Sequence, residues 1–169
     1  MFAQWKIIIA ILPTAALLGM GANAALAEEH NHDAHAHHAA QSAQPQLSLN
    51  NGSKWETDNN LRLGMTRIRD ALSADLPAIH SGKATTEQYQ ALARKTNDQI
   101  AFMVKNCKLD QKTDVMLHLV LTDIMAGADA MAGKDINEAR KGAEKIAGAL
   151  DNYGTYFAHP GWHGVKATH

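Results

Sequence analysis

Histidines are the residues whose type and spacing point most directly to chemistry in this chain. Ten of the 169 residues are histidine, and five of them fall within nine positions near the N-terminus. These five are His30, His32, His35, His37 and His38. Neutral imidazole is a common metal ligand, and a dense group of imidazoles suits copper, nickel and zinc. The cluster predicts a site for copper, with nickel, zinc or cobalt next; a polar spacer or a surface pH sensor is the alternative interpretation.

A second group of candidate ligands is spread over the rest of the chain. It contains a thioether, the only thiol and two imidazoles: Met65, Cys107, His118 and His159. Soft sulfur ligands combined with imidazole again favour copper. These four side chains can share an ion only if the fold brings them together. Whether it does depends on the arrangement of the helices that carry them.

The first residues have the order of a secretory signal peptide. Lys6 precedes an apolar run over 7–18, and small residues follow up to Ala27. An uncleaved membrane anchor is the alternative, but the run is short for a bilayer span and Pro13 interrupts it. Residues 1–27 are therefore predicted to be a signal peptide. We expect the mature protein in a bacterial periplasm, without stable membrane association after cleavage.

The position of cleavage determines a further motif. A cut after Ala27 leaves Glu28 first and His30 third, whereas a cut after Ala24 leaves Ala25 first. An amine, two backbone amides and an imidazole in third place form a planar set of four nitrogens, which suits Cu(II) and Ni(II). The later cut would thus create a short sequence that resembles the amino-terminal copper- and nickel-binding motif.

Composition excludes several classes of function. The net charge is −1 with neutral histidine, so there is no basic excess for nucleic acid. The chain contains no HExxH, no nucleophile turn and no glycine-rich phosphate loop. Glu-x-x-His pairs of the di-iron bundles are missing from its predicted helices. We therefore expect that the protein is not an enzyme.

The remaining sequence divides by its hydrophobic periodicity. Residues 28–54 have none, which predicts a disordered His-rich tail and linker. Residues 55–163 carry four apolar stripes with spacings of three and four, and 164–169 form a C-terminal tail. The predicted core positions, stripe by stripe, are Leu61, Met65, Ile68, Leu72, Leu76 and Ile79; Tyr89, Leu92, Thr96, Ile100, Met103 and Cys107; Leu117, Leu121, Ile124, Ala128 and Met131; and Ala139, Ala143, Ile146, Leu150, Tyr153 and Phe157. The first stripe follows an N-cap at Asp58 and reaches Ser81-Gly82, and Pro77 is expected to end or kink that helix. The second stripe runs from a capping box, Thr85 to Gln88, to Cys107, and the third follows a connection over 110–114 and ends near Gly133. The fourth stripe runs from a second capping box, Asp135 to Glu138, and stops before His159.

Four helices with short connections predict an all-α, up-down-up-down four-helix bundle. In this topology the first and third helices begin, and the second and fourth end, at one end of the bundle. Met65, Cys107, His118 and His159 should all lie near that end, where the segments holding Trp55, Trp162 and His163 could cover them. The alternative is that Met65 and Cys107 fill the core, His118 caps a buried polar contact, and His159 sits at a helix end favoured by the macrodipole.

This arrangement resembles the periplasmic b-type cytochromes of the cytochrome b562 kind over residues 58–159. In that family a methionine early in the first helix and a histidine late in the fourth ligate a non-covalent haem. The resemblance implies a four-helix bundle, with Met65 and His159 as the haem ligands. His159 is followed by Pro160-Gly161, and the family needs neither Cys107 nor the histidine tail.

Three hypotheses follow. The first is a periplasmic metal-binding protein for metal tolerance or trafficking, with the metal ion and a periplasmic metal-efflux component as partners. The second is an electron carrier with haem b between Met65 and His159. The third is a cofactor-free interaction module that uses the bundle as a scaffold.

Overall fold

A computed structural model describes residues 45–165 of the chain. The predicted signal peptide and the five clustered histidines fall outside the described residues, as do the last four positions. The helices are α1 (Asn59–His80), α2 (Thr86–Asn106), α3 (Gln111–Ala132) and α4 (Ile136–Tyr156). Within 45–165 there is no strand, and extended pairing is limited to isolated bridges between Asn50 and Ser53 and between Trp55 and Phe157.

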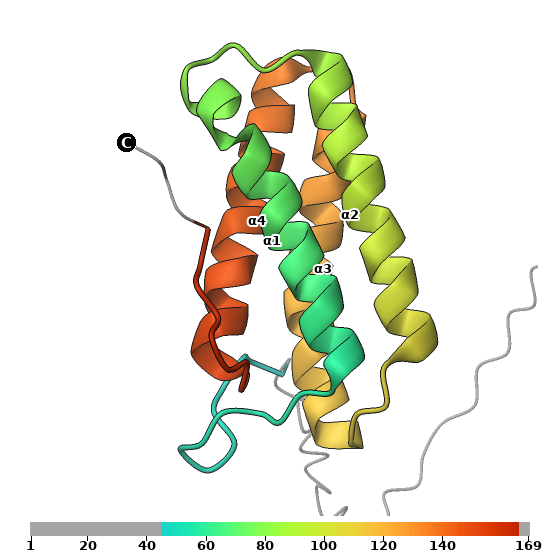
Figure 1. The fold of residues 1–169 in the computed structure, drawn as a ribbon, viewed down its shortest axis with the longest axis vertical. Coiled ribbons are helices and arrows are strands. Elements are labelled where there is room, and N and C mark those ends of the chain that lie inside the picture. The colour runs from blue at the N-terminus through green and yellow to red at the C-terminus, as the bar shows by residue number, and fades with distance from the viewer. Residues whose placement is uncertain (1–44, 166–169) are drawn as a thin grey trace, which may run out of the picture. The chain divides into compact units, whose positions relative to one another are not determined.

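The four helices run alternately up and down, and each packs against the next in sequence (Figure 1). The predicted all-α four-helix bundle is confirmed. In Figure 1, α1 begins at the same end of the bundle at which α2 ends, α3 begins and α4 ends.

Side-chain caps explain where the helices begin. Asp58 accepts a hydrogen bond from the Leu61 amide at 2.7 Å, and Thr85 and Gln88 form the complete predicted capping box. Asp110 caps α3, so this helix begins at Gln111, earlier than the expected connection over 110–114 allows. Asp135 caps α4.

Two details of the helix ends differ from expectation. Glu138 does not close a capping box; its carboxylate accepts from Lys141 at 2.7 Å instead. Pro77 does not end α1, which continues to His80. The ribbon turns aside near that end in Figure 1, as expected where a proline removes a helical hydrogen bond.

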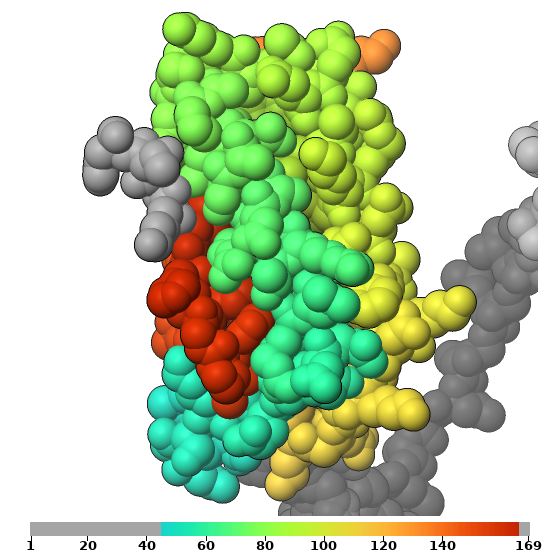
Figure 2. All heavy atoms as spheres, viewed as in Figure 1, coloured from blue at the N-terminus to red at the C-terminus, as the bar shows by residue number. Residues whose placement is uncertain are grey.

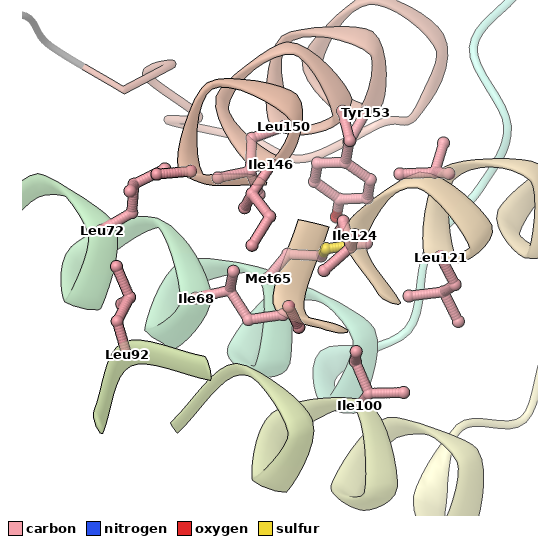
Figure 3. Packing of buried hydrophobic residues seen from close by; sticks show 14 of the residues in the cluster. Met65, Ile68, Leu72, Leu92, Ile100, Leu121, Ile124, Ile146, Leu150 and Tyr153 are labelled. Atoms are coloured by element: carbon pink, nitrogen blue, oxygen red, sulfur yellow. The ribbon is translucent and has the colours of Figure 1, made fainter. Parts of the chain in front are cut away.

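The predicted stripes form the core. All six predicted apolar positions of α1 and all five of α3 are buried. Figure 3 shows how Met65, Ile68 and Leu72 of α1 meet Ile124 of α3 and side chains of α4. Spacing alone was sufficient here, because a residue that returns every three or four positions stays on one face of a helix.

α3 and α4 approach most closely where both carry glycine. A Cβ atom on Gly127 would lie 2.6 Å from the carbonyl oxygen of Gly142, and one on Gly142 would lie 2.5 Å from that of Gly127. α1 and α4 share far fewer contacts. The bundle is therefore asymmetric, tight between α3 and α4 and looser between α1 and α4.

The segment before α1 contacts the bundle over its described part. Residues 39–54 are predicted to be a linker outside the core, yet Leu47 is partly buried against it. The indole Nε1 of Trp55 donates to the Ser48 carbonyl at 2.6 Å, and Lys54 Nζ donates to the Gly154 carbonyl at 2.6 Å. Leu47 is an apolar side chain between polar neighbours and belongs to no periodic pattern. The sequence pattern therefore could not indicate its contact with the bundle.

α3 is also the only helix in the described part of the chain that is long and apolar enough to cross a membrane. Its predicted stripe is buried between its neighbours in the bundle. The core helix of a soluble protein also meets this criterion of length and composition.

Replacing Gly127 by alanine should destabilise the protein by about 1–3 kcal/mol, because the new methyl group overpacks the α3–α4 contact. Gly148→Ala is the matched control on α4, since a Cβ there meets nothing within 4 Å. That control should stabilise by roughly 0.5–1 kcal/mol through helix propensity. Chemical denaturation measures both changes. Equal effects of the two substitutions would contradict the close approach of α3 and α4.

Candidate functional site at one end of the bundle

The chain segments that enter α1 and leave α4 are joined side by side. The Trp55 amide donates to the Tyr156 carbonyl at 2.8 Å, and the Ala158 amide donates to the Trp55 carbonyl at 2.8 Å. Trp55 and Phe157 are both buried. This short parallel pairing closes the end of the bundle and holds the residues that follow α4 against the start of α1.

Tyr153 is the central polar group of this end. Its side chain is fully buried, and its ring stacks on Phe157 with centroids 5.2 Å apart. Its hydroxyl lies 3.0 Å from Nδ1 of His159. Burial raises the pKa of Tyr153 above its usual value of 10.0, so the phenol stays protonated and requires a hydrogen-bonding partner.

Trp162 lies in the looser space between α1 and α4. Its indole would be only 2.5 Å from a Cβ atom on Gly154, so this position of α4 accommodates the ring because it has no side chain. The guanidinium of Arg69 stacks over the indole at 5.1 Å, and the ring of Tyr153 meets its edge at 4.8 Å. In Figure 1 the segment after α4, in red, runs back along that helix.

A second set of hydrogen bonds joins this segment to the first turn of α1. The Thr57 hydroxyl donates to the Ala158 carbonyl at 2.5 Å. Arg62 donates through Nη1 to the Thr57 carbonyl at 2.5 Å and to the Thr57 hydroxyl oxygen at 2.8 Å. Its Nη2 donates to the Asn59 side-chain oxygen. The guanidinium of Arg62 is therefore held in one orientation.

His159 lies between these two sets of contacts. Burial, together with the positive charges of Arg62 and Arg69, lowers the pKa of His159 below its usual value of 6.5. The ring is therefore neutral at neutral pH. One of its nitrogens faces the Tyr153 hydroxyl, and the residue also lines a surface cleft described below.

Cys107 lies at the C-cap of α2 and is half-buried. Burial and the negative charges of Asp58 and Asp114 raise its pKa to about 12. Asp58 is held in place because it caps α1 and also accepts from the Lys108 amide at 2.6 Å. Cys107 is consequently a neutral thiol at neutral pH in the metal-free protein, and binding a metal through its sulfur would release that proton.

His118 points to solvent. Its side chain is 67% exposed, and Nδ1 lies 2.8 Å from the backbone carbonyl of Asp114, one turn earlier in the same helix. Met65, in contrast, has no exposed surface, and Figure 3 shows its sulfur beside Ile124 and the ring of Tyr153. His118 and Met65 lie near the same end of the bundle, but His118 faces solvent whereas Met65 is buried in the core.

The structure thus brings together only part of the predicted ligand group. His159 and Met65 both neighbour Tyr153, and Cys107 neighbours Asp58. Over residues 45–165 no group of three or more histidine, cysteine, aspartate or glutamate side chains could hold a metal ion. Met65 has no exposed surface and His159 contacts Tyr153, and a haem ligated by Met65 and His159 stays a prediction.

A surface cleft of about 420 Å³ opens beside His159. It runs between the first turns of α1 and the residues that follow α4. Its walls are formed by Glu56, Asn59, Arg62, Leu63, Thr66, Ala158, His159 and Pro160. Met65 is not among the lining residues.

Comparisons of the chain with protein-family models, with curated proteins and with solved structures give no match. What can be said of this end of the bundle therefore rests on its own residues.

Several residues of this site were not identified from the sequence as functional. Tyr153 fits a core stripe and was predicted only as core, although a buried phenol needs a polar partner and so signals one nearby. Arg62 looked like an ordinary exposed charge on a helix. Thr57 lies in a connection, where hydrophobic periodicity gives no information.

Acid should weaken the fold through His159. Its pKa is lower in the folded state, so the unfolded chain binds more protons as the pH falls below about 6.5, and stability declines through that window. One proton allows at most about 1.4 kcal/mol per pH unit, and the partial exposure of the ring reduces this.

Urea denaturation between pH 7.5 and 5 measures the effect. His159→Gln should flatten the decline, whereas His118→Gln, at an exposed position, should leave its slope unchanged. The usual pKa values of carboxyl groups, 3.8 for Asp58 and 4.5 for Glu87, lie below this window. Identical slopes for the wild type and His159→Gln would contradict the assignment.

Proposed function

We propose that this is a periplasmic protein that binds transition metal ions, copper first and nickel, zinc or cobalt next, in metal tolerance or trafficking. The supporting observation is the sequence of residues 28–38, in which five of eleven residues are histidine. Several imidazoles so close in sequence can converge on one ion without a preformed cavity. A metal-efflux component of the same compartment is the proposed protein partner.

Copper is favoured over the other ions for two reasons. Nitrogen ligands bind divalent ions in an order that peaks at Cu(II). In addition, a mature N-terminus at Glu28 would place His30 third, where a planar set of four nitrogens suits Cu(II) and Ni(II) but not Zn(II). The proposal therefore has a low-affinity component, the imidazole cluster, and a specific one, the first three residues.

The bundle's contribution in this proposal is a stable carrier. Its core is built from residues 55–157, none of which belongs to the histidine cluster. Among residues 45–165 the other candidate ligands do not gather into a group of three or more histidine, cysteine, aspartate or glutamate side chains that could hold a metal ion. This arrangement favours placing metal binding on residues 28–38.

Deleting residues 28–38 should remove most Cu(II) and Ni(II) binding and leave the bundle's stability within about 0.5 kcal/mol of the wild type. Calorimetric titration of the mature protein measures the first quantity and urea denaturation the second. Changing the five clustered histidines to glutamine is the matched control for length and polarity. Undiminished metal binding in both variants would refute the proposal.

His30→Ala should abolish a specific Cu(II) species in protein whose N-terminus is Glu28. Protein sequencing of secreted material establishes the N-terminus first. The expected signal is a d–d absorption band at the short wavelengths typical of planar four-nitrogen coordination. His32→Ala serves as the control, because that residue is one of the cluster but cannot complete the N-terminal square. A band unchanged by His30→Ala would exclude this site.

A further inference from the structure

The cleft beside His159 combines a fixed positive charge with an apolar wall. One wall comes from the first two turns of α1 and the other from Ala158, His159 and Pro160. Figure 2 shows the C-terminal segment, in red, lying directly against the start of α1, in blue-green. The volume of the cleft, about 420 Å³, is within the range of small-molecule sites.

Arg62 supplies the positive charge. Its three hydrogen bonds all go to uncharged acceptors, the carbonyl and hydroxyl of Thr57 and the amide oxygen of Asn59. These bonds orient the guanidinium without neutralising it. Arg69 differs, because its Nη2 lies 2.6 Å from the carboxylate of Asp70. Among residues 45–165 no carboxylate forms an ion pair with Arg62, and a guanidinium positioned in this way is suited to receive a carboxylate from a ligand.

His159 offers a donor on the same side. The Tyr153 hydroxyl lies 3.0 Å from Nδ1 of His159. In the tautomer in which the phenol donates to Nδ1, the neutral imidazole carries its proton on Nε2 and can donate it to a carboxylate. Nδ1 is engaged by Tyr153, so Nε2 is the ring nitrogen available to the cleft.

The remaining residues limit the kind of anion. Glu56 also lines the cleft, and its negative charge disfavours a doubly charged group such as phosphate. Leu63 is 42% exposed there, and with Ala158 and Pro160 it forms an apolar surface suited to a short carbon chain. Thr66 and Asn59 add polar groups at the wall of α1.

We propose that this cleft binds a small monocarboxylate, with its carboxylate on Arg62 and His159 and its carbon chain on Leu63, Ala158 and Pro160. The site is separate from the proposed metal site and does not depend on it.

The test is an NMR titration of the mature protein, labelled with ¹⁵N, with sodium butanoate in the presence of a metal chelator. Saturable shifts are expected at the backbone amides of the lining residues other than Pro160, which has no N–H, and at the Arg62 side chain. Chloride, phosphate and butylamine at the same ionic strength are the comparison arms. Equal responses to chloride or phosphate would reduce the effect to unspecific charge screening and overturn the proposal.

Two pairs of variants locate the binding. Arg62→Gln should weaken butanoate binding about 10-fold or more, as expected for the loss of a charged hydrogen-bonding partner. Arg67→Gln is the control, because Arg67 lies on the same helix but stacks on Phe102 at 5.6 Å and is not among the lining residues. Circular dichroism verifies that each variant is folded.

Leu63 provides a second test that does not disturb Arg62. Leu63→Glu should repel the carboxylate and abolish binding, whereas Leu63→Gln, of the same size, should weaken it only moderately. The comparison of Leu63→Glu with Leu63→Gln tests the carboxylate site even if Arg62→Gln does not fold. Butanoate binding that is equally strong in Leu63→Glu and Leu63→Gln would overturn the proposal.

Discussion

The hydroxyl of Tyr153 is a polar group inside an apolar core, and the arrangement of this end of the bundle depends on how it is satisfied. Leaving a buried hydroxyl without a partner costs about 1–3 kcal/mol. α4 ends at Tyr156. The chain turns back after Phe157 and brings Nδ1 of His159 to 3.0 Å from the hydroxyl. Ala158 and Trp162 are positioned by the same return of the chain.

The space that receives this returning segment follows from the glycines on the other side of the bundle. Gly127 and Gly142 let α3 and α4 approach until each backbone nearly meets the other. α1 has fewer contacts with α4 than α3 has. Trp162 packs between α1 and α4, against Gly154. Small residues at one interface thus create room for a large aromatic residue at another, as close packing of a protein interior requires.

The sequence patterns that predicted the fold could not predict the site, and the reason is physical. A stripe at spacings of three and four identifies the buried face of a helix, which is why Leu61, Ile124 and Leu150 were correctly predicted as core. The spacing does not determine whether a residue at the edge of a stripe is buried or exposed. His118 is such a residue, and it turned outward, because the carbonyl of Asp114 offers its ring a partner on the surface.

The position of His159 depends on a segment with no period at all. It lies beyond the end of α4, where the chain reverses through Gly161 at a positive φ of 74° and the Trp162 amide donates to the His159 carbonyl at 3.0 Å. Helical topology placed this residue at the correct end of the bundle. Only the hydrogen bonds of the turn determine that its ring faces Tyr153 rather than Met65 or Cys107.

Histidines in this chain therefore occupy two chemically different settings. A metal ion needs several imidazole lone pairs that converge and remain free of other bonds. Within the described bundle, Nδ1 of His118 and Nδ1 of His159 hydrogen-bond to Asp114 and Tyr153, and neither ring belongs to a group of three or more metal-ligating side chains. The five histidines of residues 30–38 are separated by no apolar residue larger than alanine, so no core competes for them. In the proposed function, fold stability and metal affinity rest on separate parts of the sequence, and each could then change without loss of the other.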